Sequence, residues 1–148
     1  MANLIDKYRA THRRIRQCLD PYTARLCPEC PEPCCRKPTK VRDFDLILAR
    51  AAGHDIEHRD TASEFVDACI EALDGRATDA PTEPCDYLGE SGCVFPDDLR
   101  PFECTKWICS FLKHEVSPGD MRELRRLLSR LSDLHRLIVD ATVPRRRR

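Results

Sequence analysis

Residues 27–35 read Cys-Pro-Glu-Cys-Pro-Glu-Pro-Cys-Cys and place four thiols within nine residues. The prolines argue against regular secondary structure here, because each removes a backbone donor and biases its neighbour away from the helical region. A stiff loop also loses less conformational entropy when its thiolates converge on an ion. This stretch is therefore predicted to be a metal-binding loop around which the fold closes.

A second group of four cysteines follows after a long interval. The segment from Cys85 to Phe95 is predicted to form a β-hairpin that turns at Gly-Glu-Ser-Gly, so that its two arms direct Cys85 and Cys93 toward one ion. We predict that the two groups meet on metal through eight ligands: Cys27, Cys30, Cys34, Cys35, Cys85, Cys93, Cys104 and Cys109.

Thiolate sulfur is a soft ligand that suits zinc, iron–sulfur clusters or copper(I). Cys27 and Cys30 form a C-x2-C pair, which is typical of structural zinc sites with four ligands. The adjacent side chains of Cys34 and Cys35 tend to point apart, which favours two neighbouring sites or two irons of one cluster. Because a close triplet of cysteines with a distant fourth also fits an iron–sulfur centre, iron or a [4Fe-4S] cluster is the alternative to zinc.

The ten cysteines of the chain could instead form disulfides in an oxidising compartment. The N-terminus has no apolar run of signal-peptide length, and no stretch approaches the roughly 20 apolar residues that a membrane span needs. We therefore expect a cytoplasmic protein with reduced thiols and no membrane partner.

The net charge of zero hides a segregation of charge along the chain. Residues 1–42 carry ten Lys or Arg against four Asp or Glu, residues 43–120 carry six against eighteen, and residues 121–148 carry nine against three. Basic ends that flank an acidic middle predict attraction within the chain. The absence of aromatic residues interleaved with the basic ones argues against a nucleic-acid partner.

Apolar periodicity predicts a mainly α-helical single domain with a cysteine-rich loop and β-hairpin as its metal-binding region. An N-terminal helix is expected over 3–20, ended by Pro21, and the metal-binding core over 25–112. A C-terminal helix is expected over 117–141, opened by the capping sequence Ser-Pro-Gly-Asp, with a basic tail at 142–148.

The two terminal helices have similar lengths and are expected to form an antiparallel pair within the chain. The C-terminal helix carries the apolar stripe of this pair: Leu124, Leu127 or Leu128, Leu131, Leu134 and Ile138. A homodimer through the same stripe is the alternative. Between these helices we predict one helix from an N-cap at Asp43 to a C′ residue at Gly53, and another over 62–74.

Five further side chains resemble metal ligands by type but are assigned other roles. Cys18 and Cys69 lie on apolar helix faces and are predicted to be packing residues. His12 also lies on an apolar face, without a second histidine at helical spacing, and is predicted to be an interface residue. His54 and His58 have the spacing of a zinc pair on a helix, but follow Gly53 in polar surroundings and are predicted to be solvated.

Short motifs surround the cysteines: Cys85-Asp86-Tyr87-Leu88, Gly92-Cys93, Arg100-Pro101 and, between the two groups, Phe44-Asp45-Leu46. Together with residues 27–35, Cys104 and Cys109, they resemble the CxxCxxCC family of YkgJ-like bacterial proteins over about residues 25–112. The resemblance implies a zinc- or iron-chelating domain. Three residues separate Cys30 from Cys34 here, where the family name has two.

Closed four-thiolate sites leave no open position for a substrate, which argues against zinc catalysis. The resembled family includes flagellin lysine N-methylases, but this sequence has no glycine-rich nucleotide loop after a strand. We expect a metal-binding protein whose zinc is mainly structural, acting as a bacterial accessory or interaction protein with an unknown protein partner. The alternative is an iron–sulfur protein with a redox or methylase-related enzymatic role.

Overall fold

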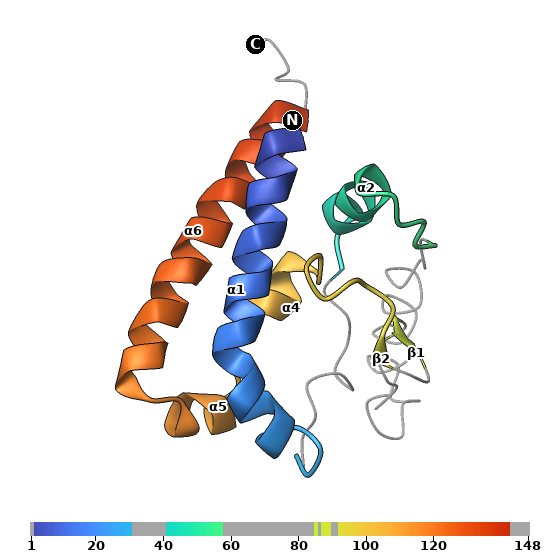
Figure 1. Ribbon diagram of the computed structural model, residues 1–148. Helices are drawn as coiled ribbons and strands as arrows, with labels where there is room; N and C mark the ends of the chain where they lie inside the picture. Colours follow the sequence, from blue (N-terminus) through green and yellow to red (C-terminus); the bar gives the residue numbers. More distant parts are fainter. Residues whose placement is uncertain (1, 31–40, 58–84, 86, 90–91, 143–148) are drawn as a thin grey trace, which may run out of the picture.

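The computed structural model describes residues 2–30, 41–57, 85, 87–89 and 92–142 (Figure 1). These residues form mostly helices, so the predicted mainly α-helical class is confirmed. The elements in chain order are α1 (Ala2–Leu26), α2 (Asp43–Ala51), β1 (Leu88–Gly89), β2 (Gly92–Cys93), α4 (Phe102–Lys106), α5 (Ser110–Glu115) and α6 (Pro118–Thr142). The helix predicted over 62–74, with Cys69, lies outside the described residues.

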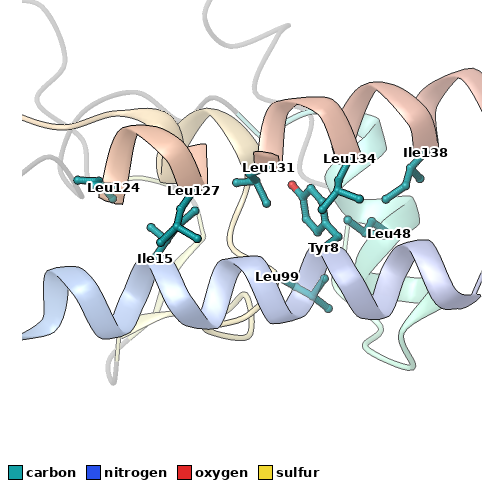
Figure 2. Packing of buried hydrophobic residues seen from close by; sticks show 9 residues of the cluster. All are labelled: Tyr8, Ile15, Leu48, Leu99, Leu124, Leu127, Leu131, Leu134 and Ile138. Atoms are coloured by element: carbon teal, nitrogen blue, oxygen red, sulfur yellow. The ribbon is translucent and has the colours of Figure 1, made fainter. Parts of the chain in front are cut away.

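The two long helices α1 and α6 lie side by side and run in opposite directions (Figure 1). The predicted leucine stripe of α6 faces α1, and Figure 2 shows Tyr8 and Ile15 of α1 among its side chains. Leu48 of α2 and Leu99 complete the buried cluster. Burying each large aliphatic side chain contributes about 1.5–3 kcal/mol. The stripe is therefore covered within the chain, as the antiparallel pair predicts.

Helix α6 begins as the sequence predicts. The backbone N–H of Asp120 donates to Ser117 Oγ at 3.1 Å, and Pro118 occupies the first helical position, where no N–H is needed. The Asp120 carboxylate in turn accepts from Ser117 Oγ at 2.8 Å and from the Tyr22 hydroxyl. The start of α6 is thereby tied to the end of α1.

Helix α1 does not end at Pro21, and the predicted boundary is wrong: the helix continues to Leu26. A proline in a helix interior costs about 3 kcal/mol or more, so contacts beyond it must offset that cost. Tyr22 accepts from the Ser117 backbone N–H at 3.2 Å, and Arg25 pairs with Glu115 at 2.8 Å. These contacts with the α5–α6 corner hold the last turns of α1 in helical form.

Helix α2 has Arg42 as its N-cap, one residue before the predicted Asp43. Its C-terminal end matches the prediction, because Gly53 adopts a positive φ of 86° at the C′ position. The N–H of Gly53 donates to the carbonyl of Arg50 at 3.0 Å, and the N–H of His54 donates to that of Ala49 at 2.9 Å. These two bonds form a Schellman motif, which requires a residue that tolerates the left-handed conformation.

The predicted attraction between the basic N-terminal region and the acidic middle is confirmed in α1. Arg9 and Arg13 both donate to the half-buried carboxylate of Asp98, at 2.9 and 2.6 Å respectively. Although partial burial alone would raise it, the hydrogen bonds and charges of these two arginines hold the pKa of Asp98 below its usual range. The basic face of α1 therefore binds the segment before α4.

Within the described residues, no helix is both long and apolar enough to cross a membrane.

Candidate functional site

The predicted hairpin is present, with Cys93 on its second strand and Cys85 three residues before its first strand. Strands β1 and β2 pair antiparallel with Leu88 opposite Cys93, and the Val94 N–H extends the pairing by donating to the carbonyl of Tyr87 at 2.9 Å. Cys85 and Cys93 are half-buried and pack against a second apolar cluster, made of Leu46, Ala49, Tyr87 and Phe95. Leu46 and Ala49 belong to α2, so this helix is the surface on which the two thiols rest.

Cys104 joins these two thiols from α4. Cys104 is exposed as a residue, but desolvation raises the pKa of its thiol to about 11, and the charges of Cys85, Cys93 and Asp45 act in the same direction. Cys85 and Cys93 are therefore near enough to act on the ionisation of Cys104. In the absence of a cation the thiol of Cys104 is protonated at neutral pH, and a metal ion would have to displace that proton.

The carboxylate of Asp45 lies beside this group and is 4% exposed. Its Oδ1 accepts from the backbone N–H of Phe102 at 3.0 Å, and its Oδ2 accepts from the backbone N–H of Arg42 at 2.9 Å. Burial raises the pKa of Asp45, while these two hydrogen bonds lower it. Since both oxygens already accept hydrogen bonds, the side chain links α2 to α4.

The other predicted ligands lie on different elements. Cys27 and Cys30 occupy the turn that follows α1, where the N–H of Cys30 donates to the carbonyl of Cys27 at 3.3 Å. Cys109 is the N-cap of α5, and its Sγ accepts from the N–H of Leu112 at 3.5 Å. Cys34 and Cys35 lie outside the described residues. The structure thus relates three of the eight predicted ligands to one another: Cys85, Cys93 and Cys104.

The donor chemistry of these three thiols fits a soft metal ion such as zinc, or the iron of a cluster. All seven described cysteines are in the thiol form. Within the described part of the chain, however, no three His, Cys, Asp or Glu side chains are grouped as closely as the ligands of one ion. Three thiols near one another also leave a tetrahedral ion one ligand short.

Two side chains that were predicted not to bind metal, Cys18 as a packing residue and His12 as an interface residue, lie against the α1–α6 core or in its interface. Cys18 is partly buried against the α1–α6 core, and its Sγ–H donates weakly to the carbonyl of Asp120 at 3.7 Å. His12 is 1% exposed, and its Nδ1 lies 3.5 Å from Thr105 Oγ1. Burial lowers the pKa of His12 to about 4, although Asp98 opposes the shift. His12 is therefore a neutral interface residue.

His54 lies on the rim of an open hollow of about 510 Å³, lined by Arg50, Gly53, His54 and Asp55. Its predicted zinc-like partner, His58, falls outside the described residues. The half-buried His54 follows the end of α2, where the chain leaves the helix. A helical His54–His58 pair would require the helix to continue beyond Gly53.

The sequence analysis did not anticipate α4, α5 or the aromatic contacts that hold α4 in place. His135 of α6 stacks on Phe102 with 4.2 Å between ring centroids, and meets Phe44 of α2 edge-on at 4.5 Å. No role was predicted for Asp45 beyond its place in the Phe44-Asp45-Leu46 motif. Its carboxylate within an apolar run was the signal from which a buried, hydrogen-bonded role could have been predicted.

Comparisons with protein-family models, with curated proteins and with solved structures find no match to this chain.

Proposed function

We propose that this chain is a metal-binding protein in which cysteine thiolates hold zinc, mainly in a structural role. The observation that supports the proposal is that Cys85 and Cys93 pack on the cluster shared by the hairpin and α2, and that their charges act on the thiol of Cys104. Thiolates from a hairpin and a separate short helix are the kind of ligand set that a structural zinc ion draws together.

The sizes of the two apolar clusters support a structural role for the metal. The α1–α6 pair has a continuous buried core, whereas four buried residues form the cluster beneath the hairpin in the part of the chain that the structure describes: Leu46, Ala49, Tyr87 and Phe95. A two-stranded hairpin is marginal without additional packing. The free energy of binding a structural zinc ion, about 10–16 kcal/mol in small domains at neutral pH, would contribute to folding.

A fourth ligand for this ion would come from the remaining predicted ligands: Cys27, Cys30, Cys34, Cys35 and Cys109. We propose that the cysteines left over from that site hold a second ion or stabilise the loop at residues 27–35. A reducing cytoplasm would keep all of them available as thiolates. The proposed accessory role in a bacterial cell would place a protein partner on the surface that exposes Trp107 and Phe111, since aromatic residues are enriched at interfaces.

Elemental analysis of the full chain, purified without oxygen, tests the proposal. We expect stoichiometric zinc in a colourless protein. Cys104→Ser should lose zinc and the ordered packing of the hairpin on α2, because a structural ion contributes on the order of 10 kcal/mol to the part of the fold that it holds. Cys18→Ala is the control, because Cys18 is a thiol that packs against the α1–α6 core; it should keep its zinc and cost about 1–2 kcal/mol.

Two results would contradict the zinc proposal. A brown protein that contains iron and acid-labile sulfide would favour the iron–sulfur alternative with a redox or methylase-related role. A chain that folds without any metal, and whose fold is unaffected by Cys104→Ser, would exclude a structural ion at this position.

A further inference from the structure

The buried carboxylate of Asp45 links α2, against which the hairpin packs, to α4, which carries Cys104. It lies at the start of α2, where it accepts the N–H of Arg42, and it reaches the first residue of α4, where it accepts the N–H of Phe102. Cys104 follows Phe102 by two residues on the same short helix. Asp45 therefore fixes the start of the short helix on which Cys104 lies.

Helix α2 also supports the other two thiols. Cys85 and Cys93 pack against the second apolar cluster, to which Leu46 and Ala49 of the same helix belong. One helix of nine residues thus holds the hairpin through its apolar side chains and α4 through a carboxylate. Because the two contacts come from adjacent positions, a shift of either one changes the distance between Cys104 and the hairpin thiols.

We propose that Asp45 is a positioning residue for the metal site, which holds α4 against α2 so that Cys104 can close on a metal ion together with Cys85 and Cys93. This inference rests on the proposed metal-binding function. Both oxygens of Asp45 are engaged by backbone N–H groups, so the residue acts through α4 and not as a ligand. Its negative charge beside the thiols also favours a cation over an empty site.

Outer groups that orient metal ligands typically affect metal affinity 10- to 100-fold. Asp45→Asn keeps the shape of the side chain but replaces one of the two accepting oxygens with a donor, so one of the two links is lost. Asp45→Glu keeps the charge and suits the third position of a helix, where glutamate can still accept the N-cap N–H. The extra methylene of Glu nevertheless moves the carboxylate relative to Phe102.

The experiment loads the reduced full chain with Co²⁺ under anaerobic conditions and follows sulfur-to-cobalt charge-transfer absorption, whose intensity reports the number of bound thiolates. Zinc affinity is then measured by competition with a chromophoric chelator. We expect Asp45→Asn and Asp45→Glu to lose part of the charge-transfer intensity and to bind zinc about 10- to 100-fold more weakly. Circular dichroism of each loaded variant shows whether the helices remain.

Asp98→Asn is the matched control, because Asp98 is also a partly buried aspartate that links two segments, through Arg9 and Arg13. It should lower stability without changing the cobalt spectrum. Wild-type absorption retained in full by Asp45→Asn, or by Asp45→Glu should Asp45→Asn fail to fold, would overturn the positioning role. The same role is overturned if Asp98→Asn changes the spectrum as much as the Asp45 variants do. A wild-type chain without any thiolate-to-cobalt absorption would instead overturn the proposed metal-binding function, and the positioning role with it.

Discussion

The ring of Tyr8 lies against the imidazole of His12 one helical turn later, with 4.7 Å between the ring centroids. Both side chains are buried, at 0% and 1% exposure, on the face of α1 that carries the core. The phenol oxygen of Tyr8 and Nε2 of His12 have no hydrogen-bond partner among the described residues. A charged imidazole is therefore strongly disfavoured at this position.

Acid should destabilise the fold through His12. Burial lowers the pKa of His12 from 6.5 to about 4, so the neutral form is favoured in the folded state. Its contribution to stability is complete above the unfolded pKa and is lost as the pH falls from about 6.5 toward 4, at most about 3 kcal/mol. We expect about 2 kcal/mol of this loss between pH 7.5 and pH 5, measured by urea unfolding.

His12→Leu removes the titrating group and should flatten this part of the pH dependence. His114→Gln is the control, because His114 is exposed on α5 and should leave the pH dependence as in the wild type. Equal slopes for the wild type and His12→Leu between pH 7.5 and pH 5 would exclude His12 as the source.

Substitutions on the buried and exposed faces of α6 should differ sharply in their effect on the free energy of unfolding. Leu131 is 0% exposed against α1, whereas Leu137 is 49% exposed. Leu131→Ala should lower the free energy of unfolding by about 2–5 kcal/mol through the cavity that it leaves. Leu137→Ala should change it by less than about 0.5 kcal/mol, and denaturant titration of the two variants compares them directly. A similar cost for both would mean that α6 does not bury this face.

Gly53 should be required for its backbone conformation and not for space. Its φ is +86°, and a Cβ added there would meet no atom within 4 Å. Gly53→Ala should therefore cost about 1–2 kcal/mol from the left-handed conformation alone. Gly53→Asn should cost less, because asparagine tolerates that region, and thermal unfolding should rank the three proteins in this order. Equal stability of Gly53→Ala and wild type would contradict the Schellman ending of α2.

Removal of metal should loosen one part of the molecule before the other, if the proposed site exists. The α1–α6 pair has its own core, while the hairpin and α2 share only the small second cluster. After chelation, amide hydrogens in residues 44–56 and 92–106 should exchange at least roughly tenfold faster, which corresponds to about 1.4 kcal/mol, while the centre of α6 stays protected. Uniform acceleration along the chain would show that the metal supports both parts equally.

The terminal helices could be predicted from sequence because their signals are local. The repeat of Leu124, Leu127, Leu131, Leu134 and Ile138 and the capping of α6 by Ser117 depend on residues a few positions apart. The end of α1 could not, because Pro21 is a strong local signal overcome by contacts with Ser117 and Glu115, far along the chain. Tertiary contacts decided this boundary.

In the candidate site, too, the parts that depend on local sequence could be predicted, and those that depend on distant contacts could not. The hairpin follows from nearby turn residues and is found in the structure, with Leu88 opposite Cys93. The approach of Cys104 depends on α4, a helix of five residues whose start is capped by Asp45 from another element. The sequence of residues 102–106 alone does not predict the contact between Phe102 and Asp45. Metal identity and the roles of Cys34 and Cys35 stay predictions.

Because α1 continues past Pro21, its last turns connect the α5–α6 corner to the turn that begins at Cys27. Proline cannot donate the hydrogen bond that would hold the turn preceding it, so the final turns depend on Tyr22 and Arg25 gripping the α5–α6 corner. Cys27 follows directly after those turns. Loss of the Arg25–Glu115 pair should therefore loosen the last turn of α1, which Cys27 follows about ninety residues upstream of Glu115 in the chain. Substitution of the Ser117 side chain should leave the contact with Tyr22, because Tyr22 accepts from the backbone N–H of Ser117.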